Sequence, residues 1–215
     1  MIRQPDDVVE LIRVAELRTT DLMSRSTGAA TGFVPSNAST LFQALRTICD
    51  CQLANGNSFC EWGSGVGTVT CVAAKLGWDA HGIEIDYELV DQSMQLASEF
   101  SLAAEFVQGS FLPPTRRQFA EEAFRDNLGR YPWLNNRADD ADENLGRGIE
   151  SFDVVFADPW PGEMYYIEQV FISESADGAL LLIYDDSAGI SVWRKVTHLP
   201  NLTIKQHASH IVDTA

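Results

Sequence analysis

A glycine-rich stretch between two apolar runs constrains the fold of this chain more than any other feature. It reads FCEWGSGVGTVTCVAAKLGWDAHGIEID over residues 59–86. The apolar run before the glycines has the length of a buried strand, and the segment after them has helical composition and ends at Gly77. A second strand-like run follows. Strand, turn, helix and strand in this order form a βαβ unit, which implies a parallel sheet with a helix packed on it.

The same alternation continues along the chain. We expect strands at residues 58–62, 79–85, 104–109, 152–158 and 178–186, and helices at 67–77, 87–101 and 164–176. Two helices, 6–25 and 39–51, precede the first strand, a short helix is expected at 189–199, and the tail at 202–212 could add a strand or hairpin. The pattern predicts an α/β fold: a doubly wound, largely parallel, Rossmann-like sheet with N-terminal helices. The few residues left after the fifth strand suggest a truncated C-terminal hairpin.

The glycine turn allows the backbone to come close to a ligand, because side chains at Gly63, Gly65 or Gly67 would occupy the space that the ligand needs. Dinucleotide-binding turns read GxGxxG, whereas this turn reads GxGxG, with Thr68 at the third glycine position. Glu61, two residues before the first glycine, would repel a pyrophosphate and suit a positively charged group. The turn is therefore predicted to hold a ligand with a cationic head.

Two later strand ends add candidate binding residues. Glu84 ends the second strand and is followed by Ile85, and a carboxylate at this place can accept hydrogen bonds from both ribose hydroxyls of a nucleoside. Ser110 and Phe111 follow the third strand and could contact a purine ring as polar partner and apolar cover. A plain strand-to-loop turn at these two residues is a nearly equal alternative.

The motifs EWGSGVG (61–67) and GIEID (82–86) resemble the first two motifs of the class I, seven-strand S-adenosylmethionine-dependent methyltransferases. The resemblance spans roughly residues 59–184 and implies S-adenosylmethionine as the cofactor. It implies that Glu61 and the glycines lie near the amino acid end of the cofactor and that Glu84 holds its ribose. The position near the adenine amino group, commonly Asp in that family, is Ser110 here.

A narrower resemblance concerns the segment TGFVPSNASTLFQAL ahead of the glycine turn. It is similar to a Tyr-Val-Pro-Thr loop in small protein-lysine methyltransferases and their bacterial relatives. The corresponding residues here are Phe33, Val34, Pro35 and Ser36, and Val66 stands where that subgroup often has Asp. This resemblance implies a protein lysine as methyl acceptor.

The fourth strand and the loop beyond it, FDVVFADPWPGE (152–163), form the candidate catalytic edge. Reacting groups meet a cofactor at the carboxyl end of the strands of an open α/β sheet. Asp158 could orient an amine or accept its proton, and it is also expected to contact the cofactor. Trp160 offers a flat face between two stiffening prolines. Amino-group methyltransferases often carry Asp or Asn, Pro, Pro and an aromatic residue here, whereas in this chain the aromatic residue comes one position earlier.

The chain is expected to form a single methyltransferase domain over residues 1–215. Its parts are N-terminal helices and a loop (1–56), a cofactor half (57–110), an insertion or lid (112–151) and a substrate half (152–215). The insertion is long, polar and acidic toward its end, which suits either a surface loop or a lid. Its aromatic stretch, with Tyr131, Trp133 and Leu134, favours a lid.

The composition excludes some partners. The formal net charge is −16, from 31 acidic and 15 basic residues, which disfavours binding to phosphate backbones. A nucleic acid is therefore not expected as the methyl acceptor. A small molecule or a basic protein segment remains compatible. No signal peptide or membrane span is evident, so a cytoplasmic location is expected. Cys49, Cys51, Cys60 and Cys71 match no metal-ligand spacing and are expected to be reduced and mostly buried, so no metal site is predicted.

Three functions are compatible with these patterns. The main one is a methyltransferase that moves a methyl group from S-adenosylmethionine to a nitrogen or oxygen nucleophile. The second is an NAD-linked oxidoreductase, which Thr68 and Glu61 disfavour. The third is a non-catalytic nucleoside-binding subunit of the same fold.

Overall fold

The computed structural model describes residues 3–25, 37–112, 141–159, 163–185, 189–198 and 201–206. Its helices are α1 (Asp6–Arg25), α2 (Ala38–Asp50), α3 (Thr68–Lys75), α4 (Tyr87–Glu99), α6 (Ala141–Leu145) and α7 (Met164–Glu174), with a 3₁₀ turn η4 (Ile149–Ser151). Its strands are β1 (Ser58–Trp62), β2 (Asp79–Glu84), β3 (Ala104–Gln108), β4 (Val154–Ala157), β5 (Leu180–Asp185), β6 (Gly189–His198) and β7 (Asn201–Gln206). Apart from β6, and from α6 and η4, which the sequence analysis did not predict, these elements lie within a few residues of the predicted ranges.

The strands of the described residues form one seven-stranded sheet in the order β3-β2-β1-β4-β5-β6-β7. The first five pair in parallel, whereas β6 is antiparallel to β5 and to β7. The chain builds outward from β1 to β3 and then returns to place β4 on the other side of β1. The strand order therefore reverses between β1 and β4, and in open α/β sheets ligands bind at the carboxyl side of such a reversal.

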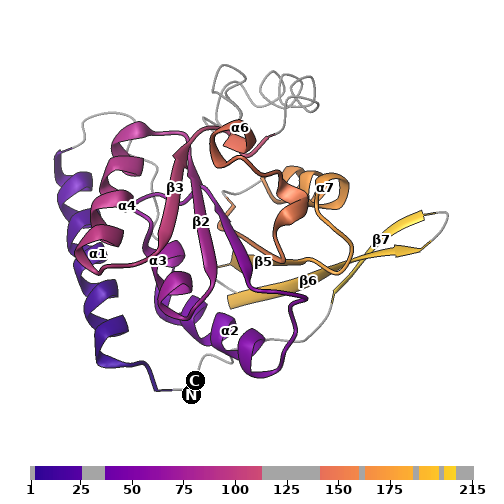
Figure 1. Ribbon diagram of the computed structural model, residues 1–215, viewed down its shortest axis with the longest axis horizontal. Helices are drawn as coiled ribbons and strands as arrows, with labels where there is room; N and C mark the ends of the chain where they lie inside the picture. Colours follow the sequence, from indigo (N-terminus) through magenta and orange to yellow (C-terminus); the bar gives the residue numbers. More distant parts are fainter. Residues whose placement is uncertain are drawn as a thin grey trace.

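Helices cover both faces of the sheet (Figure 1). The first four helices, α1 to α4, pack on one face, and α6 and α7 lie on the other. Successive residues of β1 serve both layers: Phe59 joins the cluster under α2 and α3, whereas Cys60 and Trp62 join the cluster under α7. A strand buried on both faces explains why β1 has no polar–apolar alternation in its sequence.

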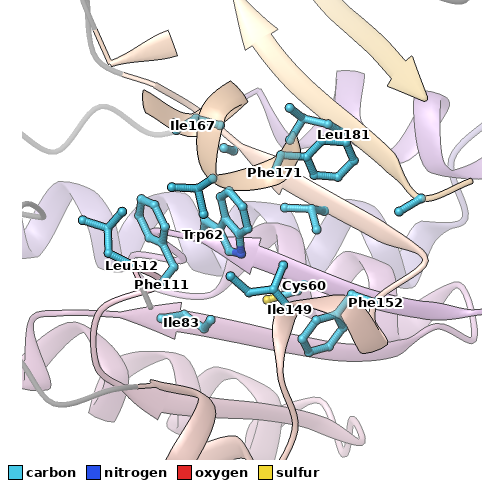
Figure 2. Close-up of a cluster of buried hydrophobic side chains, with 14 of the residues drawn as sticks. Cys60, Trp62, Ile83, Phe111, Leu112, Ile149, Phe152, Ile167, Phe171 and Leu181 are labelled. Atoms are coloured by element: carbon cyan, nitrogen blue, oxygen red, sulfur yellow. The ribbon is translucent and has the colours of Figure 1, made fainter. Parts of the chain in front are cut away.

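Figure 2 shows the cluster on the α7 face, where Trp62 lies at its centre with Phe111 and Leu112 on one side and Phe171 and Ile167 above. Burial of this many aromatic and aliphatic side chains fixes the ends of β1 and β4 against α7, because each fully buried large side chain contributes about 1.5–3 kcal/mol. The candidate catalytic edge thus rests on a packed layer.

The expected helix at 189–199 is wrong, because these residues form strand β6. Only three residues separate β5 from β6, a length that suits a hairpin and leaves no room for a crossover. Ile190 and Val192 are buried on the α2 side, whereas Trp193 packs on the opposite face, so the side chains alternate as in a strand. The second half of β6 pairs with β7 from Trp193↔Gln206 to His198↔Asn201.

Of the insertion, the structure describes Leu112 and the last part, in which α6 and η4 return the chain to β4. Asn144 Nδ2 donates to the carbonyl of Gln108 at 3.0 Å, and Arg147 Nη1 donates to Asp79 Oδ2 at 2.8 Å. The Arg147 guanidinium also lies over the Phe152 ring, 4.6 Å from its centroid. These contacts anchor the last part of the insertion to β3 and β2. The residues predicted to form a lid, Tyr131, Trp133 and Leu134, lie outside the described residues, as does the 33–36 loop.

The expectation that the four cysteines are mostly buried is wrong for two of them. Cys60 and Cys71 are buried, but Cys49 and Cys51, at the C-terminal end of α2, are exposed. All four are free thiols. Within the described part of the chain, no helix combines the length and apolar character needed to cross a bilayer.

Candidate functional site

The glycine turn lies at the carboxyl end of β1, next to the reversal of strand order. Gly63, Gly65 and Gly67 have φ of 77°, 54° and 79°, the left-handed region that other residues adopt at a cost. The amides of Gly63 and Ser64 both donate to the carbonyl of Ile83 at 2.9 Å, and the Gly67 amide donates to the carbonyl of Ser64 at 2.8 Å. These bonds hold the turn against the end of β2.

Gly63 and Gly67 have different roles in the turn. A Cβ at Gly63 would have no atom within 4 Å, so this glycine faces open space at the sheet edge. A Cβ at Gly67 would lie 2.6 Å from Ser93 Cβ and 2.7 Å from the Phe106 ring. The sequence interpretation that a ligand requires all three glycines therefore fits Gly63, whereas Gly67 is needed for packing of α3 and α4 on β3.

Glu61 is 4% exposed and binds the start of helix α3. Its Oε2 accepts hydrogen bonds from the backbone amide of Thr70 at 2.9 Å and from Thr70 Oγ at 2.6 Å. Thr70 is the third residue of α3, and the residue before that helix, Gly67, has no side chain to cap it. Glu61 therefore supplies the N-terminal cap from the adjacent strand. Burial, with a smaller contribution from repulsion by Glu84 and Asp158, raises the pKa of Glu61 to about 8.

Glu84 ends β2 as predicted and closes the other side of the turn. Its Oε2 accepts the Gly65 amide at 2.8 Å, and its Oε1 accepts the amides of Ile85 at 2.8 Å and Asp86 at 3.0 Å. Burial raises its pKa although these three amides favour the anion. A carboxylate has about four lone-pair sites, so further acceptor capacity remains for a ligand's hydroxyls.

Ser110 and Phe111, which follow β3, both contact other residues of this protein. Ser110 Oγ accepts the Leu112 amide at 3.1 Å, and the Ser110 carbonyl accepts the Ala141 amide at 3.3 Å. Phe111 stacks on Trp62 with centroids 4.9 Å apart and planes 2° from parallel (Figure 2). Both side chains are buried. Their contacts match the alternative of a structured strand-to-loop turn, and a role at a purine ring stays a prediction.

The candidate catalytic edge is described in part. Asp158 and Pro159 directly follow β4 and are half-buried, and Ile85 is half-buried at the end of β2. Trp160 and Pro161 lie outside the described residues. Of the two aromatics that begin α7, Tyr165 is exposed and Tyr166 packs on the core, with their rings edge to face at 5.6 Å. One of the two is thus a core residue, as predicted. No group of three metal-ligating side chains occurs among the described residues.

Sequence reasoning missed Thr70, which binds Glu61, and Phe106, which lies under the turn. The sequence does carry a signal for Thr70, because it is a hydroxyl residue at the third position of a helix that starts after Gly67, which has no capping side chain. In the structure Thr70 is 0% exposed. Phe106 carries no signal beyond its place in a strand. Its role depends on Gly67 and Gly82, both of which leave room for its ring.

Comparison with known proteins was made at the levels of sequence and structure. No protein-family model matches the chain, and no curated protein matches it in sequence. An O-methyltransferase from Bacillus cereus, solved with S-adenosylhomocysteine, is similar over 85% of this chain and 67% of its own, at 16% identity and a TM-score of 0.51. A putative O-methyltransferase from Klebsiella pneumoniae covers 85% of this chain and 66% of its own, at 14% identity and a TM-score of 0.49. An RNA methyltransferase from Salinibacter ruber covers 71% and 78%, at 20% identity and a TM-score of 0.48.

The Bacillus cereus likeness establishes the fold. The chain shares the Rossmann-like architecture of that O-methyltransferase, and the predicted α/β fold class is confirmed.

Proposed function

We propose that this protein is an S-adenosylmethionine-dependent methyltransferase that transfers a methyl group to a nitrogen or oxygen nucleophile. The observation that carries the proposal is that three acidic residues, Glu61, Glu84 and Asp158, lie at the same carboxyl edge of the parallel strands at which Gly63 leaves open space. They come from the ends of β1, β2 and β4. Repulsion from Glu84 and Asp158 contributes to the raised pKa of Glu61.

The electrostatics of this edge favour a cation. A cationic ligand beside these carboxyl groups would favour their ionised form and gain from it, whereas a pyrophosphate would be repelled by any of them that is ionised. S-adenosylmethionine carries a sulfonium and an ammonium group, whereas NAD carries a pyrophosphate. The acidic edge therefore supports the sulfonium nucleoside over the dinucleotide.

The residues present fit this cofactor. The space in front of Gly63, which a Cβ would enter, can admit its amino acid end, and Glu84 can accept its ribose hydroxyls. Ile85 lies beside Glu84 and can contact the nucleoside with its side chain. When bound, the cofactor supplies an electrophilic methyl group.

Asp158 is the proposed catalytic residue of this chain. It lies at the carboxyl end of β4, on the side of the strand reversal where substrates reach an open sheet. Its carboxylate can orient an attacking amine or hydroxyl and accept the proton that the nucleophile must lose. Trp160 is proposed to cover the acceptor, on the strength of its sequence position.

The proposed acceptor is a lysine-bearing basic protein segment or a small molecule. The net charge of −16 supports both and opposes a phosphate-rich acceptor. The 33–36 segment, similar to a loop of small protein-lysine methyltransferases, supports the lysine.

Titration calorimetry with S-adenosylmethionine, S-adenosylhomocysteine and NAD tests the cofactor. We expect binding of both sulfur nucleosides and none of NAD, and the absence of binding by either sulfur nucleoside would overturn the proposal. Transfer of a tritiated methyl group to lysate fractions then separates an enzyme from a nucleoside-binding subunit. Asp158→Asn is expected to keep nucleoside binding and to lose at least 10²-fold in turnover, and equal loss of both would place Asp158 in cofactor binding.

A further inference from the structure

The buried acid Glu61 is held by neutral groups. It is 4% exposed, and its Oε2 accepts hydrogen bonds from the backbone amide and the hydroxyl of Thr70. No ion pair joins Glu61 to a Lys, Arg or His of the described residues. A buried carboxylate without a counter-charge is costly, so a carboxyl group in this position keeps its proton. The raised pKa of about 8 agrees with a protonated Glu61 in the free protein at neutral pH.

The titratable groups that face Glu61 from the neighbouring elements support this state. Glu84 at the end of β2 and Asp158 after β4 both repel a negative charge on Glu61. Burial, and to a lesser extent Glu61, raises the pKa of Cys71 of α3 to about 12, and Arg18 of α1 partly offsets that shift. Cys71 is therefore a neutral thiol at physiological pH. The protein itself thus gives Glu61 more reason to hold a proton than to release it.

The space in which the cofactor is proposed to bind begins two residues after Glu61. A Cβ at Gly63 would meet no atom within 4 Å, and Glu84 closes the other side of the turn by accepting the Gly65 amide at 2.8 Å. A cation in this space would lie beside both acids. A positive charge within about 4–6 Å of a carboxyl group favours its ionised form. The ligand would therefore supply the counter-charge that the protein lacks at Glu61.

We propose that Glu61 releases its proton to solvent when the cationic cofactor binds, which makes the cofactor site sensitive to pH. The O–H bond of the carboxylic acid breaks, the electron pair stays on the carboxylate, and a water or buffer molecule takes the proton. Because binding releases a proton, affinity must rise with pH until Glu61 is ionised in the free protein as well, near pH 8. The inference rests on the proposed function, since it requires the cationic nucleoside at the glycine turn.

Calorimetry in buffers of different ionisation enthalpy counts the protons released for each S-adenosylmethionine bound. Glu61→Gln cannot ionise, and its amide oxygen can still accept from Thr70. At pH 7 the parent should release roughly 0.5–0.9 proton more than this variant. From pH 6 to pH 8 the affinity of the parent should rise at least about fivefold relative to that of the variant. The comparison cancels protons that come from the ligand itself.

Two variants of Thr70 provide a second test that leaves Glu61 in place. Thr70→Val removes the hydroxyl that favours the Glu61 anion and keeps the backbone amide, so Glu61 should ionise at a higher pH. The rise in affinity should then move upward by about 0.5–1 pH unit. Thr70→Ser keeps a hydroxyl and should follow the parent. A pH profile that is the same in Thr70→Val and in the parent, or that moves equally in both variants, contradicts the role of Glu61.

The failure of this inference is distinguishable from that of the proposed function. Binding of S-adenosylmethionine with equal proton release in the parent and Glu61→Gln overturns the inference and leaves the cofactor assignment intact. If neither sulfur nucleoside binds the parent, the proposed function is wrong and the inference falls with it. If Glu61→Gln alone does not bind, the Thr70 variants decide.

Discussion

At the scale of single residues, Glu84 serves both the turn and its proposed ligand. The same carboxylate that is placed to accept ribose hydroxyls also accepts the amide of Gly65, across the turn, and the amides of Ile85 and Asp86. The turn is therefore shaped before the ligand arrives. Removing Glu84 should damage binding twice, through the lost contact and through a looser turn.

Glu84→Ala should weaken S-adenosylhomocysteine binding at least about tenfold, because hydrogen bonds to a charged group contribute about 1.5–3 kcal/mol each. Glu84→Gln keeps an amide oxygen that can accept the Gly65 amide, so we expect a smaller loss of about three- to tenfold. Calorimetry on both variants measures the difference, with denaturant unfolding as the check on folding. Equal losses in the two variants would show that the turn does not depend on this acceptor.

Glu61 has a structural partner that its place in the motif did not predict. The acid was expected to face a cationic ligand, and the structure shows it bound to Thr70 at the start of α3. A buried acid that is protonated near neutral pH makes the stability of the protein depend on pH.

The sign of this dependence follows from the raised pKa of about 8, compared with an ordinary value of 4.5 in the unfolded chain. Below pH 4.5 both states hold the proton and the stability is fully present. Between pH 4.5 and 8 only the folded state holds it, so the free energy of unfolding falls as pH rises, by roughly 2–5 kcal/mol.

Glu61→Gln cannot titrate, and its amide oxygen can still accept from Thr70. Relative to the parent, the variant should gain stability progressively from pH 5 to pH 8. Urea unfolding at several pH values measures this gain, and parallel pH profiles for the two proteins would contradict it.

The sequence was enough to find the strand-end acids but not their partners. Glu84 and Asp158 are predictable because a strand end in a βαβ unit has a known place at the sheet edge. The bond from Glu61 to Thr70 and the packing of Phe106 under Gly67 join residues that are 9 and 39 positions apart. Such contacts depend on the angle between helix and sheet, which local composition does not encode.

At the scale of elements, the glycine turn runs directly into helix α3, and Gly63 and Gly67 have different roles in it. Gly63 faces open space, whereas Gly67 packs against Ser93 and Phe106. Gly63→Ala places a methyl group in open space, so its cost to stability is the left-handed backbone alone, about 1–2 kcal/mol. Gly67→Ala has the same strain and also collides with Ser93 and Phe106, for a total of about 3–5 kcal/mol.

The variant that loses less stability, Gly63→Ala, should therefore be the one whose ligand binding is impaired directly. Gly63→Ala should bind S-adenosylhomocysteine at least about tenfold more weakly while remaining the more stable of the two. If Gly67→Ala unfolds at the same denaturant concentration as Gly63→Ala, the packing role of Gly67 is wrong.

The largest error of the sequence prediction was also at this scale. The expectation of a helix at 189–199 followed the alternation of strands and helices seen earlier in the chain. Ile190, Val192 and Val196 are β-branched and lie at alternate positions, and this period of two was the better signal. Once β5 has formed a parallel edge, a three-residue connection can only turn back, so the sheet ends in antiparallel strands.

At the scale of the whole molecule, the net charge of −16 separates the possible acceptors by their dependence on salt. An acidic protein attracts a lysine-rich segment over about 10 Å at 0.1 M salt, and this attraction is screened to about 3 Å at 1 M. A neutral small molecule is not attracted by this charge at either salt concentration. A phosphate-rich acceptor would be repelled, and salt would relieve the repulsion.

Methyl transfer from tritiated S-adenosylmethionine can be measured on the basic protein fraction and on the ultrafiltrate of one lysate, from about 0.05 to about 0.5 M NaCl. Transfer to the basic fraction should fall at least about fivefold because encounter with a cationic segment weakens, whereas transfer to the ultrafiltrate should change less than about twofold. Calorimetric binding of S-adenosylhomocysteine at both salt concentrations shows how much of any change belongs to the cofactor. Transfer that rises with salt would contradict a basic acceptor, because only an acceptor repelled by the acidic surface gains from screening.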